Sequence, residues 1–317
     1  MISRGLLICS FYLKKKYSRS ENDVLGLNGE YEYDDIKYAN FFDLLNGFIN
    51  NFSEFANDEK SMKMFAIDKN SVIKQQKEGY TIASGIINSG AYGMEGDLTN
   101  KKTKEVVYKR SKDDADIKMF NYMIYVPKDF EEKHVVKGIM LFETIGTYGV
   151  KTITTQNLKK FFSEKYGLTL ETRSISVRIF LEKLLKKDKL NKITLVKNSV
   201  SRDRADNMFY NVGREEKTFI RPKLKDNLIN YLLEKIDGVN SNEVFEIDDD
   251  TYNDVKITFS HSNRTKTVRL MDIDHFSMIE DIPERVYPNN PSDRSRLLDY
   301  MEITACQYAE QMIFIRQ

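Results

Sequence analysis

Short segments rich in β-branched and aromatic residues recur between Lys63 and Thr152, and they constrain the fold more than any other feature of the chain. The segments are Met64–Ile67, Tyr80–Ile87, Glu105–Lys109, Met119–Val126 and Gly138–Phe142. Clusters of glycine, asparagine and aspartate separate them, which is typical of strands joined as hairpins. An opening strand is expected at Leu6–Leu13, and Tyr38–Phe55 carries apolar residues at helical spacing. We predict an antiparallel sheet with this helix packed on one face.

The second half of the chain alternates between helical and extended patterns. In chain order, we expect a helix from Thr154 to Gly167, a strand Leu168–Ile175, a helix Val177–Leu185, a strand Lys192–Val196, a helix Leu224–Ile236, a hairpin of Val255–Phe259 with Thr265–Leu270, and a helix Ser292–Ile315. Ser292 and Asp293 would cap the last helix. Its inner face would carry Leu297, Leu298, Met301, Ile303 and Tyr308.

These patterns predict an α+β fold. A chain of 317 residues exceeds the size at which one core usually divides, so two domains are expected. We place a mostly antiparallel N-terminal domain with a packed helix at residues 1–153. A mixed α/β C-terminal domain would follow at 154–317.

Charge is balanced in total but uneven along the chain. Residues 151–225 hold 19 Lys and Arg against 8 Asp and Glu, a net charge of +11. Residues 226–317 hold 9 against 18, a net charge of −9. A basic segment of this kind favours a polyanionic partner, with nucleic acid as the leading candidate and DNA preferred over RNA.

The candidate nucleic-acid-binding residues come from several elements of the basic segment: Lys159, Lys160, Arg173, Arg178, Lys183, Lys186, Lys187, Lys189, Lys197, Arg202 and Arg204. Phe209 and Tyr210, beside the last two, are candidates for stacking on a base. Without a clear stacking platform, contact with the backbone of a duplex is expected, and it would be sequence-tolerant.

Two other interpretations of the basic segment stay open. Charged runs commonly cover the solvent-facing sides of helices. An acidic protein surface, including this chain's own acidic segment in a homodimer or larger homo-oligomer, would also attract it. The sequence leaves DNA or RNA, the oligomeric state and this internal pairing undecided.

A metal-dependent nuclease is the alternative enzymatic hypothesis, and otherwise the sequence favours a protein that is not an enzyme. Asp250, Asp254 and Lys256 resemble part of an arrangement in which carboxylates hold Mg²⁺ and a lysine polarises water. An acidic turn that leads into a hairpin explains the same residues. No established motif for a cofactor or metal is present, so neither is predicted.

Cysteine usage and hydropathy bear on the cellular setting. Cys9 and Cys306 stand alone, without disulfide or metal-binding spacing, and we expect buried thiols. No segment approaches the roughly 20 apolar residues that a membrane span requires. We therefore expect a cytoplasmic protein without a membrane partner.

The order of elements resembles a known family in layout. An opening strand and a Phe/Leu-rich helix lead to a hairpin block with the strand pair Phe120–Val126 and Gly138–Phe142. A polar turn, a helix, a basic strand–helix–strand unit and a terminal helix follow. This layout is similar to that of RexA-like phage exclusion and abortive-infection proteins over most of the chain. The resemblance implies a cytoplasmic, DNA-associated protein without enzymatic activity that acts in antiviral defence.

Overall fold

The computed structural model divides the chain into two compact units. It describes residues 3–17, 23–130, 133–174, 190–198, 214–238, 245–247, 250–261, 264–270, 279–287, 294–310 and 312. Unit 1 consists of Met1–Ile175 with Ile279–Gln317, and unit 2 of Ser176–Met278. The expected division at residues 153 and 154 instead falls within helix α2 (Lys151–Lys165), whose neighbouring strand β13 (Leu168–Ser174) belongs to unit 1.

Unit 1 is built on an antiparallel sheet, which confirms the predicted α+β class. Its described strands are β1 (Arg4–Lys15), β2 (Val24–Leu25), β5 (Ala56–Asp58), β6 (Lys63–Gln76), β7 (Tyr80–Ala91), β10 (Asp116–Pro127), β11 (Lys137–Ile145), β12 (Tyr148–Gly149), β13 and β20 (Ile279–Asp281). The main order is β13-β1-β11-β10-β7-β6-β5, with β2, β12 and β20 paired beside it. Every predicted strand from 63 to 152 except the exposed Glu105–Lys109 segment belongs to this sheet.

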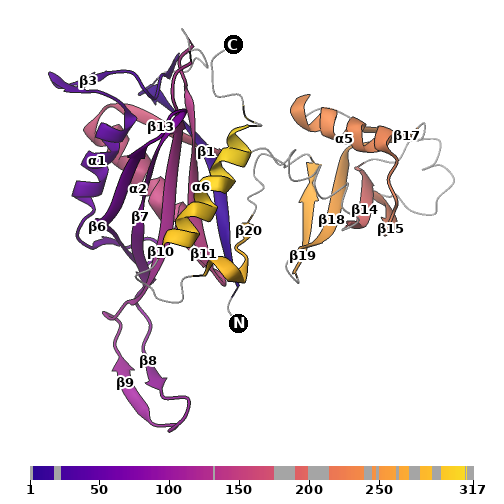
Figure 1. Cartoon of the computed structure of the whole chain (residues 1–317). Coiled ribbons are helices and arrows are strands. Elements are labelled where there is room, and N and C mark those ends of the chain that lie inside the picture. The colour runs from indigo at the N-terminus through magenta and orange to yellow at the C-terminus, as the bar shows by residue number, and fades with distance from the viewer. Residues whose placement is uncertain are drawn as a thin grey trace. The chain divides into compact units, whose positions relative to one another are not determined.

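Helices cover both faces of the sheet (Figure 1). Helices α1 (Phe41–Asn51) and α2 lie on one face, where the Phe41 ring lies 4.7 Å from that of Phe11 and 6.0 Å from that of Phe162. Gly138 permits this packing, because a Cβ there would lie 2.4 Å from the Phe11 ring. Strand β1 is therefore buried on both faces, as its nearly continuous apolar sequence requires.

Helix α6 (Ser295–Ala309) covers the opposite face and contacts β10 and β11. Its inner face differs from the prediction at one position. Ile303 is 57% exposed, whereas Thr304 and Ala305 are buried. Leu297, Met301 and Tyr308 are buried as expected, and spacings of three and four residues from these place Thr304 and Ala305 inside. The predicted caps Ser292 and Asp293 lie outside the described residues.

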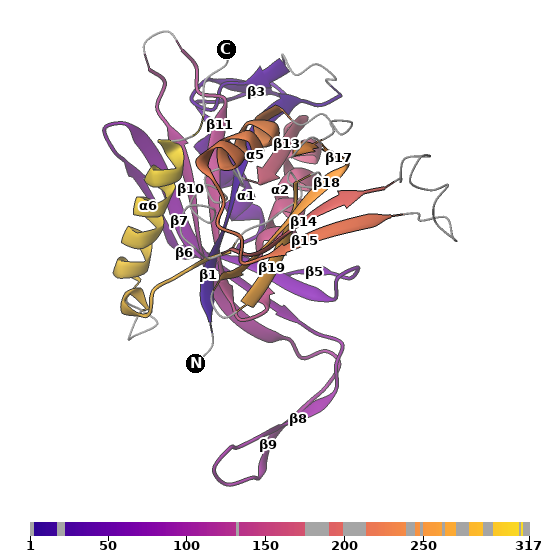
Figure 2. The ribbon, with the colours of Figure 1, turned by 90° about the vertical axis from the view of Figure 1, so that its right-hand side faces the viewer.

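Two small hairpins and a short 3-10 helix complete the described part of unit 1. Strands β3 (Tyr31–Tyr33) and β4 (Ile36–Tyr38) form one hairpin, and the 3-10 helix is Glu284–Val286. Strands β8 (Gly96–Thr99) and β9 (Val106–Arg110) form the other. This β8–β9 arm extends well away from the sheet in both views (Figures 1 and 2).

Unit 2 has its own sheet and core. Its described elements are β14 (Leu190–Lys197), β15 (Glu215–Ile220), α5 (Asp226–Gly238), β16 (Phe245–Ile247), β17 (Asp250–Tyr252), β18 (Asp254–His261) and β19 (Arg264–Arg269). The strand order is β15-β14-β18-β19, and a core that includes Leu195, Ile257 and Phe259 packs against α5. The predicted helix Val177–Leu185 lies outside the described residues.

Along the chain, unit 2 is inserted between strands β13 and β20 of unit 1. Strand β11 pairs with one edge of β1, while β13 and β20 both pair with the other. Ser174, the last residue of β13, lies opposite Cys9, and Ile279, the first residue of β20, lies opposite Leu7. Both strands run antiparallel to β1, so β20 continues the line of β13 with one position between them. After β13 the chain forms unit 2, and it then returns as β20 to the same edge of β1.

Candidate nucleic-acid interface

The predicted nucleic-acid-binding residues divide into three groups. Lys159, Lys160 and Arg173 lie in unit 1, and Lys197 lies in unit 2. The others lie outside the described residues: Arg178, Lys183, Lys186, Lys187, Lys189, Arg202 and Arg204. The two aromatic candidates, Phe209 and Tyr210, also lie outside them. The larger described group of candidates therefore lies in unit 1.

In unit 1, the pairing of β1 with β13 brings additional lysines to the predicted cations. Lys14 pairs with Thr169 and Lys15 with Leu168, at the start of the strand that follows α2. We define the basic edge as seven of the cations on or next to these adjacent elements: Lys14, Lys15, Lys16, Lys159, Lys160, Lys165 and Arg173. Only two carboxylates, Glu164 and Glu171, occur in α2 and β13. The formal net charge of the basic edge with these acids is +5.

Two cations of the basic edge are positioned by the ring of Tyr12. The Lys14 Nζ and the Arg173 Cζ each lie 5.5 Å from the centroid of this ring. Arg173 is exposed, whereas Tyr12 is only 8% exposed, so the ring packs beneath the charged groups. Cation–π contacts of this geometry orient the cations without neutralising their charge.

Two further lysines contact α2 and its neighbouring strand. Lys159 Nζ lies 3.3 Å from a Glu171 carboxylate oxygen, and both side chains are about two-fifths exposed. Such a solvent-exposed pair contributes at most about 1 kcal/mol, and an incoming anion can compete for the lysine. Lys16 Nζ donates to the Ser163 carbonyl oxygen at 3.3 Å, near the C-terminus of α2, where a cation complements the helix dipole.

Lys197, the one described candidate in unit 2, is occupied by its own unit. It forms a half-buried ion pair with Asp250 and lies 5.1 Å from the ring centroid of Tyr252. The hydrogen bond from Lys197 is the main cause that holds the pKa of Asp250 below its usual value. Lys197 thus joins β14 to β17, and we do not include it in the candidate interface.

The three residues of the nuclease hypothesis have separate partners. Asp250 pairs with Lys197, as above. Asp254 is 1% exposed and accepts a hydrogen bond from Arg269 Nε at 2.7 Å. Lys256 donates to a Glu216 carboxylate oxygen at 2.8 Å. Within the described ranges, no group of three or more His, Cys, Asp or Glu side chains could hold a metal ion.

Sequence reasoning missed Lys14, Lys15 and Lys16. The available signal was three consecutive lysines at the end of an apolar segment. Their relevance depends on pairing between β1 and β13, which are more than 150 residues apart along the chain. Charge counts taken over continuous segments do not detect such a cluster.

No protein-family model, curated protein or solved structure matches the chain. Among the described residues, no helix is long and apolar enough to cross a membrane.

Proposed function

We propose that this chain binds nucleic acid through the basic edge, with double-stranded DNA as the expected partner. The observation that carries the proposal is the collection of seven cations against two carboxylates on adjacent elements of unit 1. Lysine and arginine side chains that neutralise phosphates release condensed counterions, which provides free energy of binding. Phosphate contacts carry no base information, so binding would be sequence-tolerant.

The aromatic residues of the basic edge favour a duplex over a single strand. Single-stranded nucleic acids are bound on platforms where successive bases stack on aromatic rings. Tyr12 is covered by neighbouring side chains, while Tyr17, beside Lys16, is 87% exposed. One exposed ring is too little for such a platform, whereas the lysines suit a phosphate backbone. In a competition assay, an unlabelled duplex should displace a labelled duplex more effectively than a single strand of equal length.

A salt titration measures the number of phosphate contacts directly. For a duplex, the slope of log K against log salt is about −0.9 per phosphate neutralised, so six contacts give a slope near −5. The test variant replaces the exposed Lys15, Lys160 and Lys165 with glutamine. We expect it to retain its fold and to make the slope less steep by about 2.7, if each lysine contacts one phosphate.

The matched control replaces Lys60, Lys69 and Lys74 with glutamine. These lysines are exposed on or near strands β5 and β6, at the opposite end of the strand order. The slope of this control should equal that of the unmodified protein. The proposal is wrong if the unmodified protein fails to bind duplex DNA at low salt, or if the two triple variants have the same slope. Salt-sensitive self-association without DNA affinity would instead support an acidic protein partner.

The cellular role is a further part of the proposal. We propose that binding takes place in the cytoplasm and serves phage defence, on the strength of the layout that resembles RexA-like exclusion proteins. Expression of the chain in a phage-sensitive bacterial host should lower the plating efficiency of at least some phages. The Lys15, Lys160 and Lys165 variant should lose this effect, and the Lys60, Lys69 and Lys74 control should keep it.

A further inference from the structure

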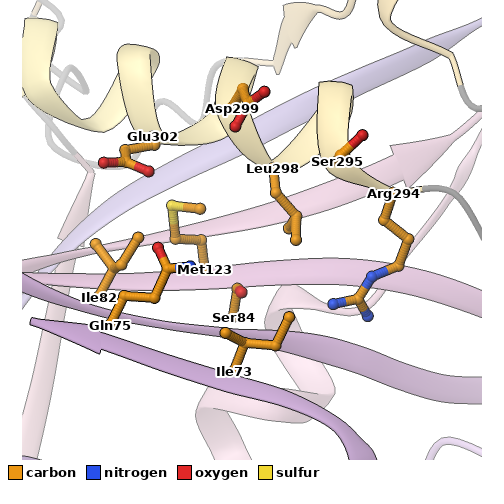
Figure 3. Close-up of a pocket in the computed structure, with 10 residues that line it drawn as sticks. All are labelled: Ile73, Gln75, Ile82, Ser84, Met123, Arg294, Ser295, Leu298, Asp299 and Glu302. Carbon is orange, nitrogen blue, oxygen red and sulfur yellow. The ribbon is translucent and has the colours of Figure 1, made fainter.

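A pocket lies between α6 and the sheet within unit 1, on the face opposite α1 and α2. Its volume is about 360 Å³, and its walls come from β6, β7, β10 and the first turns of α6. Figure 3 shows Arg294 at one end and Glu302 at the other, with Leu298 pointing from the helix into the space between them. This volume is within the range of sites for small organic molecules.

Arg294 gives the pocket one polar end. Its Nη2 donates to the Ser71 carbonyl oxygen at 3.1 Å. Its Nη1 is buried and has no hydrogen-bond partner within the described part of the chain. Burial also lowers the pKa of the guanidinium from its usual value, although Asp68 opposes this effect. The guanidinium nevertheless stands at the wall of the pocket, where its positive charge would attract an anionic group of a ligand.

The middle of the pocket is mainly apolar. Ile73, Ile82, Met123 and Leu298 line it, and the side chain of Ser84 lies among them on the floor (Figure 3). An apolar group of a ligand would be removed from water there, which favours binding. The arrangement therefore matches a molecule with a charged end and an aliphatic body.

The opposite end limits the charge that a ligand can carry. Glu302 accepts a hydrogen bond from the Tyr80 hydroxyl at 2.6 Å and lies 3.6 Å from Lys77 Nζ. Asp299 adds a second carboxylate at the rim. Two acids beside the pocket repel a phosphate dianion more strongly than they repel a monoanion.

We infer that this pocket binds a small aliphatic monocarboxylate, with its carboxylate at the guanidinium of Arg294 and its hydrocarbon chain against Ile73, Ile82, Met123 and Leu298. The inference does not depend on nucleic-acid binding, because the pocket and the basic edge use different residues. A bound carboxylate would pair with the guanidinium of Arg294, which joins the start of α6 to β6 through Ser71. Binding to the folded state should therefore raise the melting temperature.

The test uses hexanoate as the probe with the full-length chain, measured by calorimetric titration and thermal melting. Hexanol, which has the same carbon chain without the charge, is the matched ligand control. We expect hexanoate to saturate one site and raise Tm, and inorganic phosphate not to compete. Replacing Arg294 with methionine should weaken hexanoate binding at least tenfold while leaving any hexanol binding unchanged.

Arg296→Met is the matched control variant, since Arg296 is exposed on the same helix, and it should bind hexanoate like the unmodified protein. If Arg294→Met does not fold, Leu298→Trp provides the second test, because an indole ring would fill the pocket and block hexanoate. The inference is overturned if hexanoate at about 20 mM neither releases heat nor shifts Tm. It is equally overturned if the folded Arg294→Met or Leu298→Trp variant binds hexanoate as tightly as the unmodified protein.

Discussion

Removal of residues 176–278 should leave unit 1 folded. The deletion joins residue 175 directly to Ile279. Ser174 lies opposite Cys9 and Ile279 opposite Leu7, so residue 175 would take the position opposite Ile8. The shortened chain would then form one uninterrupted strand beside β1, and the pairs of β13 and β20 would keep their register.

The size of the effect follows from chain entropy. Each doubling of a connecting loop costs about 0.6 kcal/mol, so a flexible connection of roughly 100 residues costs about 4 kcal/mol relative to a direct join. Unit 2 has its own core, which restrains that connection and reduces the cost. We expect the free energy of unfolding of unit 1 to rise by between zero and about 4 kcal/mol. Urea denaturation followed by circular dichroism measures this difference.

A deletion one residue longer is the matched control. Removal of 175–278 would place Ile279 opposite Ile8 and turn every side chain of β20 to the other face of the sheet. Glu280 would then lose its hydrogen bond from the Tyr308 hydroxyl. We expect this variant to be at least about 2 kcal/mol less stable than the 176–278 deletion. An unfolded 176–278 deletion, or equal stability of the two, would refute the reasoning.

Two other predictions concern buried ionisable groups. Asp254→Asn should lower the free energy of unfolding by about 1.5–3 kcal/mol, because the hydrogen bond from Arg269 loses its charged acceptor. Asp97→Asn on the exposed arm should change the free energy of unfolding by less than about 0.5 kcal/mol. Urea denaturation of both variants is the measurement, and equal effects would contradict the prediction. Burial raises the pKa of Cys9 to about 11, so its proton is released more readily on unfolding, and stability should fall as pH rises from about 9 to 11. Denaturation midpoints measured across this pH range should fall less in Cys9→Ala than in the unmodified protein. If both proteins show the same pH dependence, Cys9 is not its source.

The strands of unit 1 could be predicted because their residues carry local signals. Tyr80–Ile87 and Met119–Val126 are apolar segments bounded by turn residues, and both are strands near the predicted limits. The insertion of unit 2 could not be predicted in this way. Nothing in Ser174 or Ile279 indicates that they lie two positions apart along β1, since that relation arises only when three distant segments pair.

The candidate sites show the same division. Lys159, Lys160 and Arg173 were found from segment charge, but Lys14 and Arg294 were not. Lys14 joins the basic edge through strand pairing, and Arg294 becomes part of a pocket only when α6 packs on the sheet. Ile303 shows the opposite problem, because an apolar residue was assigned to the core although the phase of the helix places it outside.

The β8–β9 arm has a consequence for the behaviour of the protein in concentrated solution. Within the described structure, β8 and β9 pair only with each other, so both outer backbone edges of the arm can accept another strand. Leu98, Val107 and Tyr108 are at least 48% exposed on it, which would favour such pairing between copies. Lys101, Lys102 and Lys104 crowd the turn at its tip. Their mutual repulsion opposes edge-to-edge stacking of two arms, so neutralising them should promote aggregation first at this ribbon.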